Sequence, residues 1–122
     1  MERSLNILLV DDEEIIHQTI GGYLTDSGHK VKAVCDGFAA LKAIESKKYD
    51  IAFIDMRMPG MDGLSLFTRL QDICPEMPVV IIAGRGDMDA ANEALKLGVS
   101  DFLRKPVGLL ELDTILEKIQ PD

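Results

Sequence analysis

Five short strand-like runs, each followed by a segment with helical spacing, constrain the fold of this chain most strongly. The runs span residues 5–10, 31–35, 51–54, 79–83 and 101–103. Short runs of this kind are typical of strands buried inside a sheet. The apolar residues after each run recur at intervals of three or four, which predicts an amphipathic helix. The sequence therefore predicts five strands that alternate with five helices.

This alternation predicts right-handed crossovers, a parallel sheet and helices on both faces. The expected fold class is open α/β, a flavodoxin-like three-layer sandwich with strand order 2-1-3-4-5. In that order the winding of the sheet reverses between strands one and three, and ligands bind at the carboxyl ends of those strands. We expect the 122 residues to form one domain, 1–122.

Two helix details follow from the spacing. Asp12 is expected to cap the first helix, and Gly28 is expected to end it. In the second helix, the apolar residues step by three through Phe38, Leu41 and Ile44, and Asp36 and Gly37 mark its start.

Carboxylates follow two strands that this topology makes neighbours. Asp11 and Asp12 come directly after strand one, and Asp55 comes directly after strand three. Three clustered carboxylates repel one another unless a cation neutralises them. An all-oxygen site suits Mg²⁺ better than zinc. The sequence therefore predicts a magnesium site at this edge of the sheet.

Lys105 ends strand five at the same edge, where its ammonium group can hold an anion against the carboxylates. Carboxylate, metal and lysine together indicate phosphoryl chemistry. One carboxylate oxygen would attack phosphorus while Mg²⁺ and Lys105 stabilise charge in the transition state. Asp55 is the best candidate for the nucleophile.

Composition narrows the function classes. The chain has 13 basic and 21 acidic residues, a formal charge of −8, so we expect this domain not to bind nucleic acid directly. No apolar run approaches the roughly 20 residues that span a bilayer, and we expect neither membrane insertion nor a signal peptide. Cys35 and Cys74 have apolar neighbours and are expected to be reduced core residues, which favours a cytoplasmic location.

Several motifs now point to a family. They are Asp11-Asp12, Asp55 with Met58-Pro59-Gly60-Met61-Asp62-Gly63 after it, Gly86-Asp87, and Asp101-Phe102-Leu103-Arg104-Lys105-Pro106. Over essentially its whole length the chain resembles a response-regulator receiver domain of two-component signalling. The resemblance implies that Asp55 accepts a phosphoryl group from a sensor histidine kinase or a phosphotransfer protein. It implies a phosphoprotein that promotes its own phosphotransfer, not an enzyme with multiple turnover.

The resemblance also implies roles for individual residues. The implied Mg²⁺ ligands are Asp12, Asp55 and the backbone carbonyl of Arg57, with Asp11 acting through a water. Lys105 would contact the phosphoryl group, and backbone amides near Arg57 and Gly84 would donate hydrogen bonds to its oxygens. A cis peptide would join Lys105 to Pro106.

One position departs from the family pattern. Ala83 stands at the end of strand four, where receiver domains usually carry Thr or Ser. In the family, that hydroxyl binds the phosphoryl group and lets the aromatic residue at the position of Phe102 rotate inward. Its loss removes one charge-assisted hydrogen bond, worth roughly 1.5 to 3 kcal/mol. We expect phosphorylation to survive and the coupling to Phe102 to be weakened or re-routed.

Other functions stay open on sequence alone. Ala83 supports a pseudo-receiver or scaffold that works without phosphorylation. The same acidic groups could serve a Mg²⁺-dependent phosphohydrolase, although such enzymes use an alternating DxD motif and a cap domain for which 122 residues leave no room. The sequence leaves open whether the chain is a stand-alone regulator or one domain of a longer protein, with an output domain in cis or in trans. Homodimers through the fourth and fifth helices are common in the family.

Some polar residues are expected to have no chemical role. Asp62-Gly63 and Gly86-Asp87 are typical of turns and helix caps. His17 and His29 are expected to be exposed, because a receiver domain needs no histidine of its own.

Overall fold

The structure of the chain is a computed structural model that describes residues 4–119. It contains one parallel sheet with the strand order β2-β1-β3-β4-β5. The strands are β1 Asn6–Val10, β2 Lys30–Val34, β3 Ile51–Asp55, β4 Val79–Ala83 and β5 Asp101–Arg104. The expected flavodoxin-like strand order is confirmed.

Helical segments follow every strand. They are α1 Glu14–Ile16, η1 His17–Gly21, α2 Gly22–Asp26, α3 Gly37–Ser46, α4 Gly63–Ile73, α5 Met88–Leu97 and α6 Leu109–Glu117. The first three are consecutive and form one helical stretch whose middle turn, η1, is π-helical. The five predicted helices are therefore present.

The start of the first helix corrects one expectation. The residue at the N-cap is Glu13, not Asp12, and its side chain makes no capping hydrogen bond. The side chain of Asp11 instead accepts a hydrogen bond from the backbone N–H of Glu13 at 2.9 Å. The carboxylate of Asp11, and not that of Asp12, therefore binds a backbone N–H at the start of this helix. Gly28 follows the helix with φ +99°, as expected for a residue that ends it.

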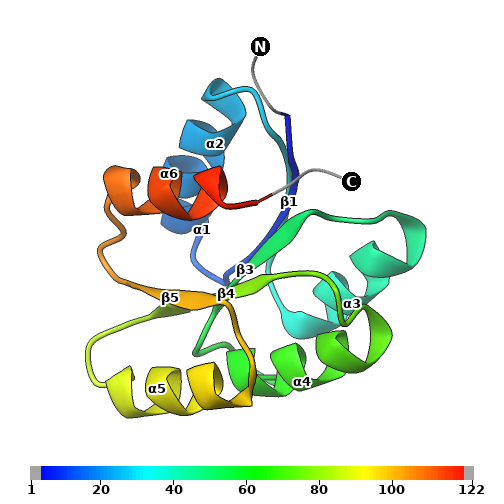
Figure 1. Ribbon diagram of the computed structural model, residues 1–122, viewed down its shortest axis with the longest axis vertical. Coiled ribbons are helices and arrows are strands. Elements are labelled where there is room, and N and C mark those ends of the chain that lie inside the picture. Colours follow the sequence, from blue (N-terminus) through cyan, green and yellow to red (C-terminus); the bar gives the residue numbers. More distant parts are fainter. Residues whose placement is uncertain (1–3, 120–122) are drawn as a thin grey trace.

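The helices form two layers around the sheet (Figure 1). Helices α1, α2 and α6 cover one face, and α3, α4 and α5 cover the other. Every residue of β3 and β4 is buried. Each face has its own apolar cluster, and both clusters include residues of these central strands. Burial on both faces explains why the two strands read as continuous apolar runs.

Helix α3 buries its small residues and not its larger apolar ones. The side chain of Phe38 is 61% exposed, and Leu41 and Ile44 are only partly buried. The buried residues of this helix are the small ones, Gly37, Ala40 and Ala43. Small side chains let the helix lie close to the sheet, which moves the larger apolar residues to the rim of the contact.

The cysteine expectation is wrong for one residue. Cys35 is exposed and Cys74 is half-buried, and both are free thiols. Among residues 4–119 no helix is both long and apolar enough to cross a lipid bilayer.

A glycine fixes the loop that follows β3. Gly63 begins α4, and its backbone N–H donates to the carbonyl of Met56 at 2.9 Å. A Cβ atom at Gly63 would overlap the carbonyl oxygen of Asp55 and lie 2.9 Å from the Cα of Met56. The expected capping role of Asp62 is confirmed, because its side chain accepts from the N–H of Ser65 at 2.8 Å. The start of α4 is thus held against the end of β3.

We expect Gly63→Ala to lower the free energy of unfolding by about 1 to 3 kcal/mol, because the added methyl group must displace backbone atoms. Gly22→Ala is the matched control, since Gly22 is helical and a Cβ there meets no atom within 4 Å. The control should raise the free energy of unfolding by up to about 1 kcal/mol. Urea denaturation followed by circular dichroism measures both changes, and equal stability of the two variants would contradict the role of Gly63.

Candidate functional site

Three carboxylates meet at the carboxyl ends of β1 and β3. Asp11 follows β1 directly, Asp12 is the next residue, and Asp55 is the last residue of β3. Each offers an oxygen that lies within 4.8 Å of the others. Asp11 and Asp55 are buried, whereas Asp12 is exposed. The structure therefore brings together the three carboxylates that the topology predicted to be neighbours.

The ammonium group of Lys105 lies among these carboxylates. Its Nζ is 3.4 Å from Asp55 Oδ1 and 3.5 Å from Asp11 Oδ2. The same Nζ donates to Glu13 Oε1 at 2.5 Å. Lys105 is thus shared by three carboxylates, two of them buried. The sequence did not single out Glu13 as part of the site, although it lies only two residues after Asp11.

The backbone around Lys105 ties its strand to the neighbouring one. Its N–H donates to the carbonyl of Ala83 at 2.9 Å. The peptide bond between Lys105 and Pro106 is cis, which confirms the geometry that the family resemblance implied. The Lys105 side chain and the end of β4 therefore lie at the same edge as Asp55.

Burial and mutual repulsion disfavour ionisation of the buried carboxyls. Burial, followed by the charge of Asp11, raises the pKa of Asp55 to about 6, although Lys105 and the backbone N–H of Arg57 oppose the shift. Burial also raises the pKa of Asp11. Burial alone would lower the pKa of Lys105, but the hydrogen bond to Glu13 and the nearby carboxylates outweigh it and raise that pKa. Lys105 therefore stays charged throughout the neutral range.

The donor set fits a hard divalent cation. Asp11 Oδ2 is buried and accepts no hydrogen bond from any described residue. Lys105 Nζ, 3.5 Å away, forms an ion pair with it. A buried anionic oxygen without a full partner is costly. A cation among Asp11, Asp12 and Asp55 would provide that partner and offset the repulsion. Oxygen-only ligation with one exposed side, open to water, suits Mg²⁺.

Arg57 and Gly84, whose backbone amides were expected to bind the phosphoryl group, both contact Asp87, which the sequence did not predict. Gly84 follows β4, and its N–H donates to Asp87 Oδ2 at 3.2 Å. The other oxygen of Asp87 pairs with Nε of Arg57, the second residue after β3. Asp87 is 5% exposed. Asp87 occupies the N-cap position of α5, and its N–H closes a turn on the carbonyl of Gly84 at 3.2 Å, but its side chain makes no capping hydrogen bond.

The two switch positions lie as follows. Ala83 is fully buried at the end of β4 and carries no hydroxyl group. Phe102 in β5 is half-buried and packs against the apolar cluster between the sheet and α3, α4 and α5. Its ring is thus neither fully exposed nor fully buried.

The histidines are not the exposed residues that were expected. The side chain of His17 is 12% exposed, and its Nε2 lies 2.6 Å from the backbone carbonyl of Asp11. His29 is half-buried and accepts a hydrogen bond from the N–H of Leu5 at 3.1 Å. His17 is the first residue of the π-helical turn η1.

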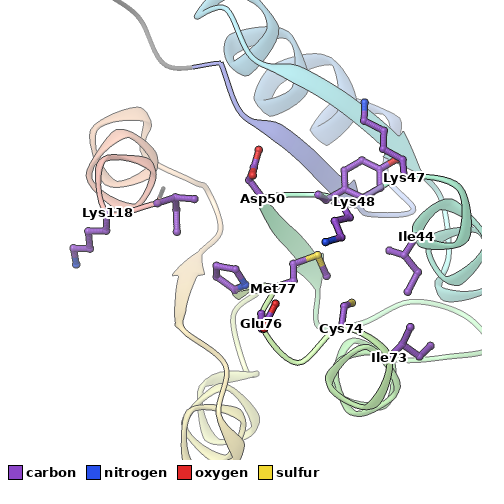
Figure 2. Close-up of a pocket in the computed structure, with 12 residues that line it drawn as sticks. Ile44, Lys47, Lys48, Asp50, Ile73, Cys74, Glu76, Met77 and Lys118 are labelled. Atoms are coloured by element: carbon purple, nitrogen blue, oxygen red, sulfur yellow. The ribbon is translucent and has the colours of Figure 1, made fainter. Parts of the chain in front are cut away.

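A cavity of about 390 Å³ lies at the opposite end of the sheet (Figure 2). It is bordered by Asp50, which precedes β3, and by Lys47, Lys48 and Lys118. The whole length of β3 separates Asp50 from Asp55. The two buried carboxylates of the cluster, Asp11 and Asp55, lie at the other edge of the sheet. The candidate site for phosphoryl chemistry is therefore the carboxylate cluster and not this cavity.

The raised pKa of Asp55 gives a stability prediction. In the folded chain the Asp55 carboxyl keeps its proton up to about pH 6, whereas in the unfolded chain it releases the proton near pH 4. Between these two pH values the unfolded chain is favoured by its ionised carboxyl, so the free energy of unfolding falls as pH rises. We expect Asp55→Asn to raise the free energy of unfolding by about 1 to 3 kcal/mol near pH 7 without divalent metal, and by much less near pH 4.

Urea denaturation in EDTA at the two pH values measures this difference. Asp72→Asn, at an exposed position on α4, is the matched control and should change stability by no more than about 0.5 kcal/mol. An Asp55→Asn variant that is less stable than the wild type near pH 7 would show that Asp55 is not strained by its neighbours.

Comparison with known proteins agrees with this geometry. A family model described as the response regulator receiver domain matches residues 7–117. The nitrogen assimilation regulatory protein NtrX of Azorhizobium caulinodans is 36% identical over 115 residues, which cover 93% of this chain and 25% of that protein. The DNA-binding transcriptional regulator NtrC of Escherichia coli is 34% identical over 118 residues, which cover 97% of this chain and 25% of that protein.

Solved structures agree as well. The crystal structure of the receiver domain of NtrX from Brucella abortus superposes with a TM-score of 0.87 at 36% identity, over 92% of this chain and 95% of that one. The chain spans about a quarter of the length of the two curated relatives named above. The match over residues 7–117 shows that the chain belongs to the response-regulator receiver domain family.

Proposed function

We propose that this receiver domain accepts a phosphoryl group on Asp55 in a Mg²⁺-dependent reaction and signals by a change of conformation. The observation that carries the proposal is the position of Asp55. It is a buried carboxylate grouped with Asp11 and Asp12, with Lys105 Nζ at 3.4 Å. A nucleophile, an oxygen-ligand set for a cation and a fixed positive charge thus lie within one small volume.

The proposed step is a single displacement. An ionised oxygen of Asp55 attacks phosphorus, and the new O–P bond forms as the bond from phosphorus to the leaving group breaks. The electron pair of the broken bond stays with the leaving group, which is an imidazole nitrogen of phosphohistidine or the carboxylate of acetyl phosphate. Because the pKa of Asp55 is about 6, the attacking form predominates at neutral pH even before a cation binds.

The other residues hold and neutralise charge. Lys105 stays protonated and faces the oxygens of the transferred group, which lowers the energy of the charged transition state. Asp12, Asp55 and the backbone carbonyl of Arg57 would hold Mg²⁺, with Asp11 acting through a water. The ion would supply charge neutralisation that the carboxylates cannot provide. Backbone N–H groups near Arg57 and Gly84 would donate to the phosphoryl oxygens.

The proposal is for a signalling domain, not a multiple-turnover enzyme. The phosphoryl donor would be a sensor histidine kinase or a phosphotransfer protein in the cytoplasm. Residues 1–122 would form one receiver domain, with its output in another domain in cis or in trans. Support comes from the relatives, which are regulators about four times as long as the matched segment. The acidity of this chain argues that any DNA contact would be made outside it.

A second candidate function rests on Ala83. Without a hydroxyl at the end of β4, the domain would serve as a scaffold whose surface is independent of phosphorylation. The complete set of Asp11, Asp12, Asp55 and Lys105 favours the first proposal, because a scaffold has no use for the strain of buried carboxylates. Homodimerisation through α5 and α6, the fourth and fifth helices of the chain, would be one form of output in either case.

Intact-mass spectrometry after incubation with acetyl phosphate and Mg²⁺ separates the two functions. We expect the wild type and Asp72→Asn to gain the mass of one phosphoryl group. Asp55→Asn should gain none, and EDTA should abolish the gain in the wild type. If the wild type is not modified by acetyl phosphate or by a range of donor kinases, the scaffold function is the better description.

A further inference from the structure

A buried carboxylate of the protein, Asp87, binds donors that follow β3 and β4. The carboxylate of Asp87 holds the N–H of Gly84 with one oxygen and the guanidinium of Arg57 with the other. Asp87 is buried, while the Arg57 side chain is 76% exposed. The pair thus joins the loop after β3 to the loop after β4. It borders an open hollow between these loops and α5.

Both donors that Asp87 holds belong to residues that follow strand ends at the edge of the proposed phosphoryl position, Arg57 after β3 and Gly84 after β4. Asp55 pairs with Ile82 across the sheet, which places Gly84 just beyond the end of β4 at the same edge. The carbonyl of Ala83 accepts from the N–H of Lys105, whose side chain contacts Asp55. The same peptide group, between Ala83 and Gly84, carries the Gly84 N–H that donates to Asp87.

We propose that Asp87 is a tethered competitor of the phosphoryl group, which must displace this carboxylate from Gly84 and Arg57. The inference rests on the proposed phosphorylation of Asp55. An acyl phosphate carries about one to two negative charges on oxygens that need donors. A buried carboxylate on the same N–H repels it, so the two anions exclude each other.

This exclusion provides a coupling that needs no hydroxyl at position 83. Asp87 is the N-cap residue of α5, and its carbonyl accepts the hydrogen bond of Ala91 N–H at 2.9 Å. Release of its side chain breaks the links to Gly84 and Arg57, so the β4–α5 loop and the residue that begins α5 are no longer tied to the loop after β3. Arg57 becomes free to turn toward the phosphoryl oxygens. In this chain the movement of a carboxylate takes the place of the movement of a hydroxyl.

The test uses beryllofluoride with Mg²⁺ as a phosphoryl mimic, and calorimetry gives its dissociation constant. Asp87→Asn removes the charge and keeps an oxygen for Gly84, whereas Asp87→Ala removes both. We expect each variant to bind beryllofluoride about fivefold or more tightly than the wild type, within the range of typical coupling between two sites. Asp89→Asn, an equal charge change at an exposed position on α5, should bind as the wild type does.

The sign of the change separates competition from a structural role. A residue that merely supports the loop would weaken binding when it is replaced, and circular dichroism with urea denaturation shows whether each variant is folded. Equal or weaker binding by both folded variants overturns the role of Asp87 while leaving the proposed function intact. Absence of binding by the wild type and every variant overturns the proposed function and this inference with it.

A second readout follows the loop itself. Hydrogen exchange of residues 84–91 should become faster when beryllofluoride binds the wild type, because Asp87 leaves its two partners. The same segment should exchange faster in Asp87→Ala without the mimic. Unchanged exchange in both cases would show that Asp87 does not restrain this loop.

Discussion

The site depends on the repulsion among three carboxylates confined to one edge of the sheet. Asp11 and Asp55 are buried, and only the ammonium group of Lys105 is close enough to compensate them within the described chain. Burial raises the pKa of both carboxyls, so their ionised state stores unfavourable energy. That energy is available to bind a cation and to favour attack on an electrophilic phosphorus. The fold tolerates the strain because β3 and β4 are buried along their whole length.

Parallel strand order turns distant positions of the chain into one site. The carboxyl ends of β1, β3, β4 and β5 lie side by side, so residues from four separate loops meet there. Opposite charges then link the loops in pairs. Lys105 joins the end of β5 to β1 and β3, and Arg57 joins the loop after β3 to Asp87 before α5. The charge on Asp55 acts directly on Lys105, whose Nζ also contacts Asp11 and Glu13 after β1.

Much of the fold and the centre of the site could be predicted from the sequence because they follow from the spacing of apolar residues and from the order of the strands. Apolar runs located the strands, and the strand order placed Asp55 beside Asp11. Contacts that depend on side-chain rotamers could not be predicted. Asp87 has the spacing of a helix cap, yet its carboxylate turns toward Arg57, which is 30 residues away. His17 Nε2 lies against the backbone carbonyl of Asp11, and α3 buries alanines in place of its larger apolar residues.

Reductive trapping after incubation with acetyl phosphate and Mg²⁺ tests most directly which carboxylate accepts the phosphoryl group. Borohydride reduces an aspartyl phosphate to homoserine, and peptide mass spectrometry then identifies the modified position. Burial beside Lys105 and the geometry of the cluster predict homoserine at Asp55 alone. Homoserine at Asp11 or Asp12, or equal labelling of all three positions, would contradict the assignment of Asp55 as the nucleophile.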